Sequence, residues 1–438
     1  MTPHRWQERI RTVELVRRRG KVRRLRSTFI EADGPAVPLG TLCQVARAAP
    51  GAPPVTAEVI GVDPASITLA PFEQLGGTVP GAEVIALPTS DEVPVGDAFL
   101  GRMVDPLGRA IDGKPLGATA ARGGLYAPGP APLDRAAPEK PLQTGIRAID
   151  GLLTFARGQR IGIFAAAGVG KTSLVHQLAG QVEAGRVVVA LIGERGREVN
   201  GLWSSLPADV RKRAVLVAAT SDQSAILRAR AAFYAMSLAE HWREQGHNVL
   251  LLVDSVTRLA MALREIGLAA GEPPTVRAYT PNVFAAVPRL IERAGAVRGG
   301  GSISAVMTIL AETDELDDPI CEMMKSLLDG HILLTRGLAE RGHFPAIDVS
   351  RSVSRHAAAV CTPSARDHAR TVTGWLSAFE ETRTMRQAGL YSPGADAHVD
   401  RALERHPALL RFLRQPHDEK VPFADALEAL AKLAEGAE

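Results

Sequence analysis

The sequence predicts an α/β protein in which a largely parallel sheet flanked by helices follows a small β-barrel and precedes a helical domain. Three observations support this order. Strand-like apolar runs alternate with helical stretches in the middle of the chain, short β-rich pieces punctuated by Gly and Pro precede them, and the β signal fades after about Pro363. Alternation of this kind is typical of parallel sheets, because a crossover helix joins neighbouring parallel strands.

Length and composition describe a globular chain. Its 438 residues, 46% of them apolar, would suit about three domains. No apolar run reaches the ~18 residues of a membrane helix, and the basic N-terminus lacks the apolar core of a secretory signal. We therefore expect a cytoplasmic protein whose contact with any membrane is peripheral. The three cysteines lie far apart without metal-ligand spacing and are assigned no function.

A basic arm is predicted for residues 1–25. Residues 1–26 carry ten Lys and Arg against two Glu, a net charge of +8, so the overall +3 leaves −5 for the rest of the chain. Trp6, Ile10 and Val13 recur at helical spacing. Two interpretations stay open: a solvated helix without a partner, or a docking helix for an acidic protein or an anionic membrane surface.

A β-barrel is predicted for residues 26–95. Short β-rich pieces at 55–62, 67–69 and 84–87 alternate with turn residues, a pattern of a small barrel or sandwich. Barrels that bind single-stranded nucleic acid present stacking aromatic side chains, whereas residues 27–100 contain only three aromatic residues, all phenylalanines. We therefore expect no nucleic-acid partner.

The α/β domain is expected over residues 96–362, entered through an irregular Gly- and Pro-rich connection at 101–141. Its clearest helix is predicted at 221–245. The predicted strands are 160–165, 187–192, 215–218, 249–253, 303–310 and 331–334. The helical domain, residues 363–438, is predicted to contain helices at 365–386, 400–414 and 423–434.

The segment after the first of these strands predicts a triphosphate site. Small residues, a Lys-Thr pair and a helical pattern follow the strand, so backbone N–H groups and a helix N-terminus can surround a polyphosphate. Lys171 supplies a cation and Thr172 a hydroxyl for Mg²⁺. The strict pattern requires Gly where this chain has Ala165, so only its relaxed form matches. The nucleotide-binding residues predicted here are Ala166, Ala167, Gly168, Val169, Gly170, Lys171, Thr172 and Ser173.

Two carboxylates follow predicted strands. Asp254 ends a fully apolar run and is the predicted Mg²⁺ partner with Thr172, directly or through water. Glu194 is the first charged residue after the strand 187–192 and could orient or deprotonate an attacking water. The alternatives are a helix cap for Asp254 and a charged surface turn for Glu194.

Two further residue types could complete the site. Segment 346–355 carries two arginines, which could stabilise charge on a γ-phosphate of the same or a neighbouring subunit, or form ordinary salt bridges. Phe344 could stack on a nucleotide base or belong to the core.

Together these motifs resemble the type III secretion ATPases, relatives of the catalytic subunits of rotary ATP synthases and of the flagellar export ATPase. The similarity extends from about residue 26 to the C-terminus. Segment 144–154 is more similar to the injectisome branch, whereas Ala260-Met261 is similar to the flagellar branch. Besides the loop, the matching motifs are Gly-Glu-Arg-Gly-Arg-Glu at 193–198, Asp-Ser-Val-Thr-Arg at 254–258, Gly-Glu-Pro-Pro at 271–274, Asp-Gly-His-Ile at 329–332 and Ser-Val-Ser-Arg at 352–355.

The resemblance implies a RecA-like P-loop ATPase core in a homohexameric ring, with ATP and Mg²⁺ bound between subunits. By matching motif, Lys171 and Thr172 would bind phosphate and Mg²⁺, and Glu194 would activate water. Arg195 and Arg258 would lie near the γ-phosphate, and Arg355 would be an arginine finger inserted from the adjacent protomer. Phe344 lies where the family has an aromatic residue under adenine.

The resemblance also implies partners. These are a stator-like regulator at the N-terminal arm, a central stalk protein in the pore and chaperone–substrate complexes at the helical domain. The location would be the inner face of a membrane-embedded secretion apparatus. The leading function is ATP hydrolysis that drives type III secretion by releasing chaperones and unfolding export substrates. The alternatives are flagellar export by the same family, a non-catalytic ring subunit, disfavoured by Glu194, and a nucleic-acid translocase, disfavoured by the aromatic-poor barrel.

Overall fold

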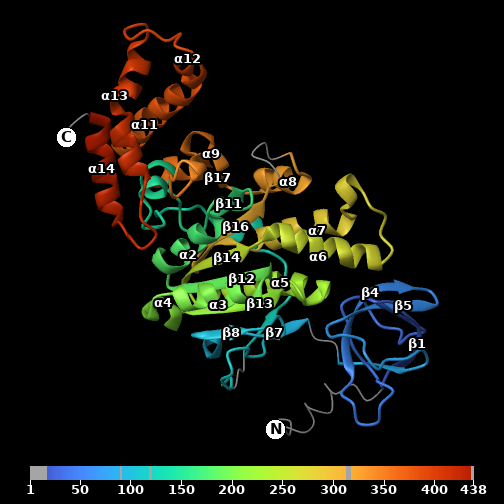
Figure 1. Ribbon diagram of the computed structural model, residues 1–438. Helices are drawn as coiled ribbons and strands as arrows, with labels where there is room; N and C mark the ends of the chain where they lie inside the picture. The colour runs from blue at the N-terminus through green and yellow to red at the C-terminus, as the bar shows by residue number, and fades with distance from the viewer. Residues whose placement is uncertain (1–16, 89–90, 118–120, 312–316, 436–438) are drawn as a thin grey trace, which may run out of the picture.

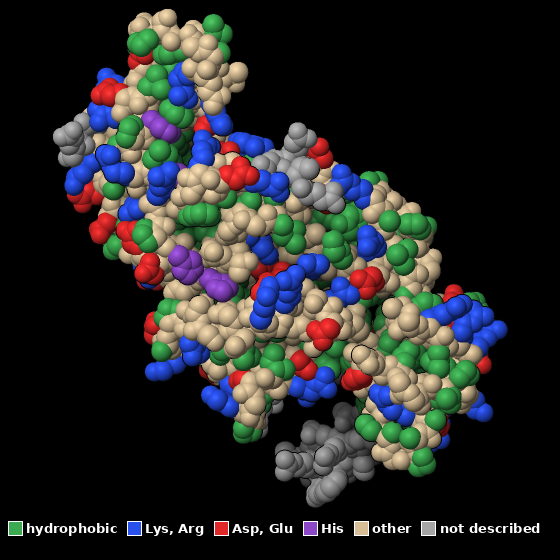
Figure 2. All heavy atoms as spheres, viewed as in Figure 1, with side chains coloured by type: hydrophobic (Ala, Val, Ile, Leu, Met, Phe, Trp, Pro, Cys, Tyr) green, Lys and Arg blue, Asp and Glu red, His purple; other side chains and the backbone are tan. Residues whose placement is uncertain are grey.

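The computed structural model describes residues 17–88, 91–117, 121–311 and 317–435. The barrel, the sheet domain and the C-terminal helices follow one another along the molecule, so the barrel and the last helices lie at opposite ends (Figure 1). On the visible face, acidic and basic side chains are interspersed (Figure 2). Among the described residues no helix is both long and apolar enough to span a membrane.

The N-terminal strands close into a barrel in the order β1-β2-β5-β4-β3-β6, which decides between the barrel and the sandwich. Along β4, Val55, Ala57 and Val59 point into its core. The strands are β1 (Arg19–Leu25), β2 (Ile30–Ala32), β3 (Leu42–Val45), β4 (Val55–Asp63), β5 (Ser66–Pro71) and β6 (Glu83–Ala86).

The first strand corrects the predicted arm. Arg19–Leu25 pair with β2 and β6 instead of continuing the arm to residue 25. A barrel strand needs inward apolar side chains only at alternate positions, and here Val22 is buried while the basic residues around it face outward. Because most residues of β1 face outward, its sequence resembles that of a basic surface segment rather than that of a strand. The helix expected from the spacing of Trp6, Ile10 and Val13 lies outside the described residues.

A ten-stranded, mainly parallel sheet forms the middle of the molecule, with its main path in the order β18-β17-β11-β16-β14-β12-β13-β8. All six predicted strands are present. The strands are β8 (Arg102–Val104), β10 (Arg135–Ala136), β11 (Arg160–Ala165), β12 (Arg186–Glu194), β13 (Ala214–Thr220), β14 (Asn248–Asp254), β15 (Gly295–Val297), β16 (Ser302–Leu310), β17 (Gly330–Leu334) and β18 (Val353–Ser354).

The connection at 101–141 is less irregular than predicted. Strand β8 extends the sheet beside β13, β10 pairs with β15, and β7 (Glu92–Pro94) pairs with β9 (Arg122–Gly124). These strands have only two or three residues each, which is too short for an alternating pattern to be visible in the sequence.

Helices cover both faces of the sheet, which explains why its strands are apolar throughout. Along β12, Val188 and Ala190 pack on the side of α5 and α6, whereas Val187 and Val189 pack on the side of α2 and the C-terminal helices. The helices of this domain are α2 (Lys171–Gln181), α3 (Gly196–Ser205), α4 (Ala208–Lys212), α5 (Ala225–Glu244), α6 (Val256–Ala269), α7 (Pro281–Glu292), α8 (Pro319–Leu327), α9 (Arg336–Glu340) and α10 (Ala357–Val360). Single-turn 3₁₀ helices lie at Asp97–Phe99, Pro132–Asp134, Val276–Ala278 and Val349–Arg351 (η5), and a π-helix at Ala148–Leu153.

The C-terminal helices pack on the face of the sheet that carries α2. Trp375 of α11 shares its core with the π-helix residue Ile149 and with Leu409. The connection between the last two helices is held by Gln415, whose Nε2 donates to the Gly145 carbonyl at 2.7 Å. The helices are α11 (Pro363–Glu381), α12 (Arg383–Gln387), α13 (Ala397–Leu413) and α14 (Phe423–Glu435). The helix predicted at 365–386 is thus divided into α11 and α12.

Candidate active site

The predicted phosphate loop connects β11 to α2. Gly168 and Gly170 have φ of +82° and +95°, a conformation that costs glycine little and other residues much more. Ala165 is the last residue of β11 and pairs with Leu310 and Leu334 on either side. A residue in extended conformation has a backbone that any amino acid can adopt, so glycine is not required at this position. The departure from the strict pattern therefore leaves the turn intact.

The loop is anchored on one side and open on the other. Ala166 and Val169 are buried, whereas Ala167 and Gly168 are exposed. Thr172 and Ser173, in the first turn of α2, are exposed as well. The backbone N–H groups at the N-terminus of this eleven-residue helix favour a bound anion.

Three charged side chains meet beneath the loop. Lys171 is buried, and its Nζ hydrogen-bonds to Asp254 Oδ1 at the end of β14. The same Nζ lies 3.7 Å from Glu194 Oε1 at the end of β12. These strands are parallel neighbours of the sheet, so their carboxyl ends reach the same edge. The two predicted carboxylates and the predicted lysine therefore lie together.

The electrostatic setting of Glu194 suits a proton acceptor. Burial raises the pKa of Glu194 to about 7, an effect that Lys171 opposes and the nearby Asp254 carboxylate reinforces. A general base is most effective when its pKa lies near the working pH. The surface-turn alternative for Glu194 does not fit this half-buried position beside Lys171.

The oxygen atoms near the loop fit a magnesium ion that is held mainly by phosphates. Thr172 offers an exposed hydroxyl and Asp254 a carboxylate, both hard oxygen ligands. Among the described residues no group of three or more His, Cys, Asp or Glu could hold a metal alone. Mg²⁺ usually takes one or two protein ligands in nucleotide sites. Ser255, not Asp254, caps α6 by accepting from the Arg258 N–H at 3.3 Å.

Asp254 has a further partner that sequence reasoning missed. Thr308 Oγ1 donates to Asp254 Oδ1 at 2.6 Å from the adjacent strand β16. Thr308 is one of few polar residues in an otherwise apolar run, and this was the available signal. The hydrogen bond fixes the carboxylate that faces Lys171.

Arg258 and Arg195 lie at the same end of the sheet as Glu194. Arg258, on α6, packs so closely on the end of β12 that a Cβ at Gly193 would lie 3.4 Å from its side chain. Its Nε is buried and has no hydrogen-bond partner among the described residues. Arg195 directly follows Glu194 and is exposed at the start of α3.

Arg355 lies at the opposite end of the sheet. Its backbone N–H donates to the Asp329 carbonyl at 2.9 Å, and Asp329 also accepts from the backbone N–H of Arg160, the first residue of β11. The phosphate loop leaves the other end of β11, roughly 17 Å away at ~3.3 Å per residue, beyond the reach of an arginine side chain. The structure therefore does not bring Arg355 to the phosphate loop of its own chain.

Phe344 lies beside the phosphate loop. A Cβ at Gly170 would be 3.5 Å from its ring, and 48% of Phe344 is exposed, so the ring is not part of the core. The Phe344 carbonyl accepts from the Gln415 N–H at 3.0 Å. Gln415, which sequence reasoning did not single out, thus connects this aromatic residue to the C-terminal helices.

Comparisons with known proteins agree with this geometry. Residues 145–354 match the ATP synthase alpha/beta family, nucleotide-binding domain, and residues 361–432 match the T3SS EscN ATPase C-terminal domain. The flagellum-specific ATP synthase of Salmonella typhimurium is 43% identical, over 95% of this chain and 93% of that protein. The type 3 secretion system ATPase of Xanthomonas euvesicatoria is also 43% identical, over 97% and 96%.

Solved structures give the same result. The assembled ATPase EscN from the enteropathogenic E. coli type III secretion system superposes with a TM-score of 0.90 at 39% identity, covering 95% of this chain and 100% of that one. EscN in complex with its central stalk EscO gives a TM-score of 0.87 at 39% identity, with the same coverage of both chains.

Proposed function

Because the chain belongs to the type III secretion and flagellar export ATPases of the ATP synthase alpha/beta family, we propose that it hydrolyses ATP as a homohexameric ring that drives type III secretion through an injectisome. The match of its C-terminal region to the EscN domain supports the injectisome branch. Flagellar export is the second candidate, because the identity to the Salmonella flagellar protein is equally high.

One observation carries the proposal of hydrolysis rather than binding alone: Glu194 and Asp254 both face Lys171. A loop that only held a nucleotide would need the lysine and the backbone N–H groups, but no second carboxylate with a pKa near neutrality. Glu194 is placed to orient or deprotonate the attacking water.

The chemistry of the site follows from an exchange of partners at Lys171. When ATP enters, Lys171 would turn from Asp254 to the β- and γ-phosphates, and this leaves the Asp254 carboxylate available to Mg²⁺ together with Thr172. Bound Mg²⁺ would neutralise phosphate charge. Arg258 and Arg195 would then face charge that develops on the γ-phosphate.

The position of Arg355 supports a site shared between copies. It is exposed and too far from its own phosphate loop, so in a ring it would act on ATP held by the adjacent protomer. The assembled state of EscN supports a ring, and the complex of EscN with EscO supports a central stalk as partner.

Further partners follow from the same family membership. The basic arm before β1 would dock a stator-like regulator and touch the inner face of the membrane-embedded apparatus. The C-terminal helices from residue 363 would meet chaperone–substrate complexes. The protein would then act in the cytoplasm, where export substrates are recruited.

Replacing Glu194 with Gln tests the proposal. We expect kcat to fall by roughly 10²–10⁴, the usual contribution of a general base, while the Kd for ATP stays nearly unchanged. Glu183→Gln, at an exposed position just after α2, is the matched control and should keep wild-type turnover. Turnover that survives in Glu194→Gln would contradict the assignment.

The pH profile is a second readout of the same residue. Because the pKa of Glu194 is raised to about 7, the group is protonated below that pH and cannot accept a proton from water. We therefore expect kcat/KM of the wild-type protein to rise as the pH increases through about 7.

A further inference from the structure

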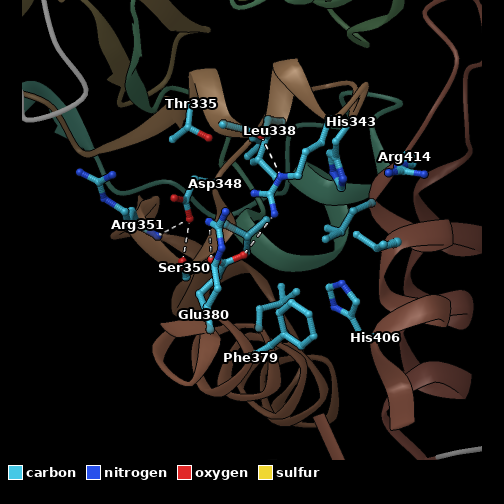
Figure 3. A pocket seen from close by; sticks show the side chains of 18 residues that line it. Thr335, Leu338, His343, Asp348, Ser350, Arg351, Phe379, Glu380, His406 and Arg414 are labelled. Carbon is cyan, nitrogen blue, oxygen red and sulfur yellow. Dashed lines mark hydrogen bonds and ion pairs between the residues drawn. The ribbon is translucent and has the colours of Figure 1, made fainter. Parts of the chain in front are cut away.

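A cavity of about 480 Å³ lies between the sheet domain and the C-terminal helices, apart from the phosphate loop (Figure 3). One wall comes from α9 and η5 of the sheet domain, and the other from α11, α12 and α13. None of the residues assigned to the ATP site above lines this cavity. Its volume lies in the range of about 300–1,000 Å³ found for small-molecule sites.

The charges around the cavity are unbalanced. Four arginines and two carboxylates line it, which leaves a net charge of +2 while its histidines are neutral. Two of these arginines share one carboxylate at long distance, because Glu380 lies 3.8 Å from Arg341 and 3.6 Å from Arg383. The charged residues are Arg341, Arg351, Arg383, Arg414, Asp348 and Glu380.

Two imidazoles in the cavity wall have a ring nitrogen without a partner. His343, from the sheet domain, is only 2% exposed, and its Nδ1 has no hydrogen-bond partner among the described residues. The same holds for Nδ1 of His406 on α13. In Figure 3 both rings lie at the same cavity, one from each domain. Buried polar atoms are costly when unpaired, so these nitrogens point to a polar ligand.

Both imidazoles are uncharged at neutral pH. Burial is the main cause that lowers the pKa of His343 to about 4, and the nearby Arg414, Arg341 and His406 contribute to the same shift. Burial and the nearby Arg386 also lower the pKa of His406, which Glu380 partly opposes. A neutral imidazole can donate one N–H to an anion, while the arginines supply the charge.

One wall of the cavity is formed by aromatic and aliphatic side chains. The rings of His406 and Phe379 stack at 3.5 Å between centroids with 7° between their planes. Arg386 lies 3.8 Å over the Phe379 ring. Leu376, Leu410 and Leu413 complete this side. The cavity thus offers an apolar surface beside its basic groups, which suits a ligand with an organic body.

We propose that this cavity binds a small organic phosphate. A phosphomonoester carries a charge of about −1.5 to −2 at pH 7, which matches the net charge of +2 around the cavity. One arginine guanidinium can donate two parallel hydrogen bonds to the oxygens of a phosphate, and the imidazole N–H groups would be further hydrogen-bond donors to it. The body of the ligand would lie against the wall formed by Phe379 and the leucines.

The bound phosphate would be coupled to the ATP site. His343 precedes Phe344, whose ring lies beside Gly170 and whose carbonyl accepts from Gln415. A ligand that holds His343 in place would therefore also restrict the position of Phe344, the residue proposed to stack on the nucleotide base. We expect its occupancy to change the KM for ATP.

Calorimetric titration of the full-length protein tests the proposal. The phosphate loop is first filled with Mg²⁺ and a non-hydrolysable ATP analogue, and ribose 5-phosphate, ribose and inorganic phosphate are then added separately. We expect saturable binding of ribose 5-phosphate at millimolar concentrations, weaker binding of inorganic phosphate and no binding of ribose. Absence of saturable ribose 5-phosphate binding, or equal binding of inorganic phosphate, would overturn the proposal.

Matched arginine variants locate the site. Arg341→Gln and Arg383→Gln should each weaken ribose 5-phosphate binding about tenfold or more, because each removes charge-assisted hydrogen bonds. Arg370→Gln, at an exposed position of α11 outside the cavity, should bind like the wild type. All three are surface-accessible arginines, and a thermal melt of each checks that folding is retained. Equal affinity in all three variants would overturn the assignment of this cavity.

The coupling has its own readout. Ribose 5-phosphate should change the KM for ATP of the wild-type protein but not of Arg383→Gln. A KM that stays constant in both proteins would contradict the link through His343 and Phe344.

Discussion

The two ends of the central sheet differ in how their charged side chains are held. At the carboxyl end, Lys171, Glu194 and Asp254 are buried or half-buried and satisfy one another. At the amino end, Arg355 is exposed, and within the described part of the chain its guanidinium donates to the Lys325 carbonyl alone, at 3.3 Å. The residues proposed to bind ATP thus lie together within one chain, whereas Arg355, the proposed charge-stabilising residue, faces outward.

The difference has an electrostatic basis. A buried lysine is tolerated because carboxylates lie next to it, and a triphosphate can replace them as partner. Among the described residues no carboxylate forms an ion pair with Arg355, so its charge is free to act on an anion brought by another copy. A single chain would then bind ATP but hydrolyse it slowly.

The largest expected effect is a loss of turnover without a loss of ATP binding when the arginine at the amino end of the sheet is removed. Arg355→Ala should lower kcat about 10³-fold, as expected for an arginine finger, and leave ATP binding by the single chain unchanged. Arg366→Ala, at an exposed position of α11, is the control and should keep full activity. If Arg355→Ala lost ATP binding as severely as turnover, the residue would act within its own chain and the comparison would fail.

A smaller effect, on the KM for ATP, is expected when the aromatic residue beside the phosphate loop is removed. Phe344→Ala should raise the KM for ATP about tenfold, because stacking on a base is worth roughly 1–3 kcal/mol, while kcat stays close to wild type. Phe344→Tyr keeps the ring and should restore the KM. An unchanged KM in Phe344→Ala would show that the half-exposed ring beside Gly170 does not contact the base.

The sequence predicted the parts of the fold whose chemistry is local. Strand β14 is apolar because both faces of the sheet are covered, and the glycines before Lys171 mark a backbone turn that other residues disfavour. Glu194 and Asp254 are predicted as site residues because each lies at the end of such a strand. The N-terminal strand β1 was missed, since a barrel strand with one inward valine looks like a basic surface segment.

The remaining features depend on contacts between distant segments. Thr308 supports Asp254 from the neighbouring strand β16, and Gln415 reaches Phe344 from the connection between the last two helices. No pattern within either segment encodes these pairings. The distance between Arg355 and the phosphate loop likewise depends on the contacts of Asp329 with Arg355 and Arg160, which hold Arg355 near the start of β11.

Mixing two inactive variants tests most directly whether the site is shared between copies. Lys171→Ala removes the phosphate-binding lysine and Arg355→Ala removes the finger, so neither protein alone should turn over ATP. In mixed rings, an intact loop of the Arg355→Ala chain meets an intact arginine of the Lys171→Ala chain at about a quarter of the interfaces. The account predicts that ATPase activity returns on mixing, with a maximum near equal amounts. Absence of activity at every ratio, while the variants still co-assemble, would contradict it.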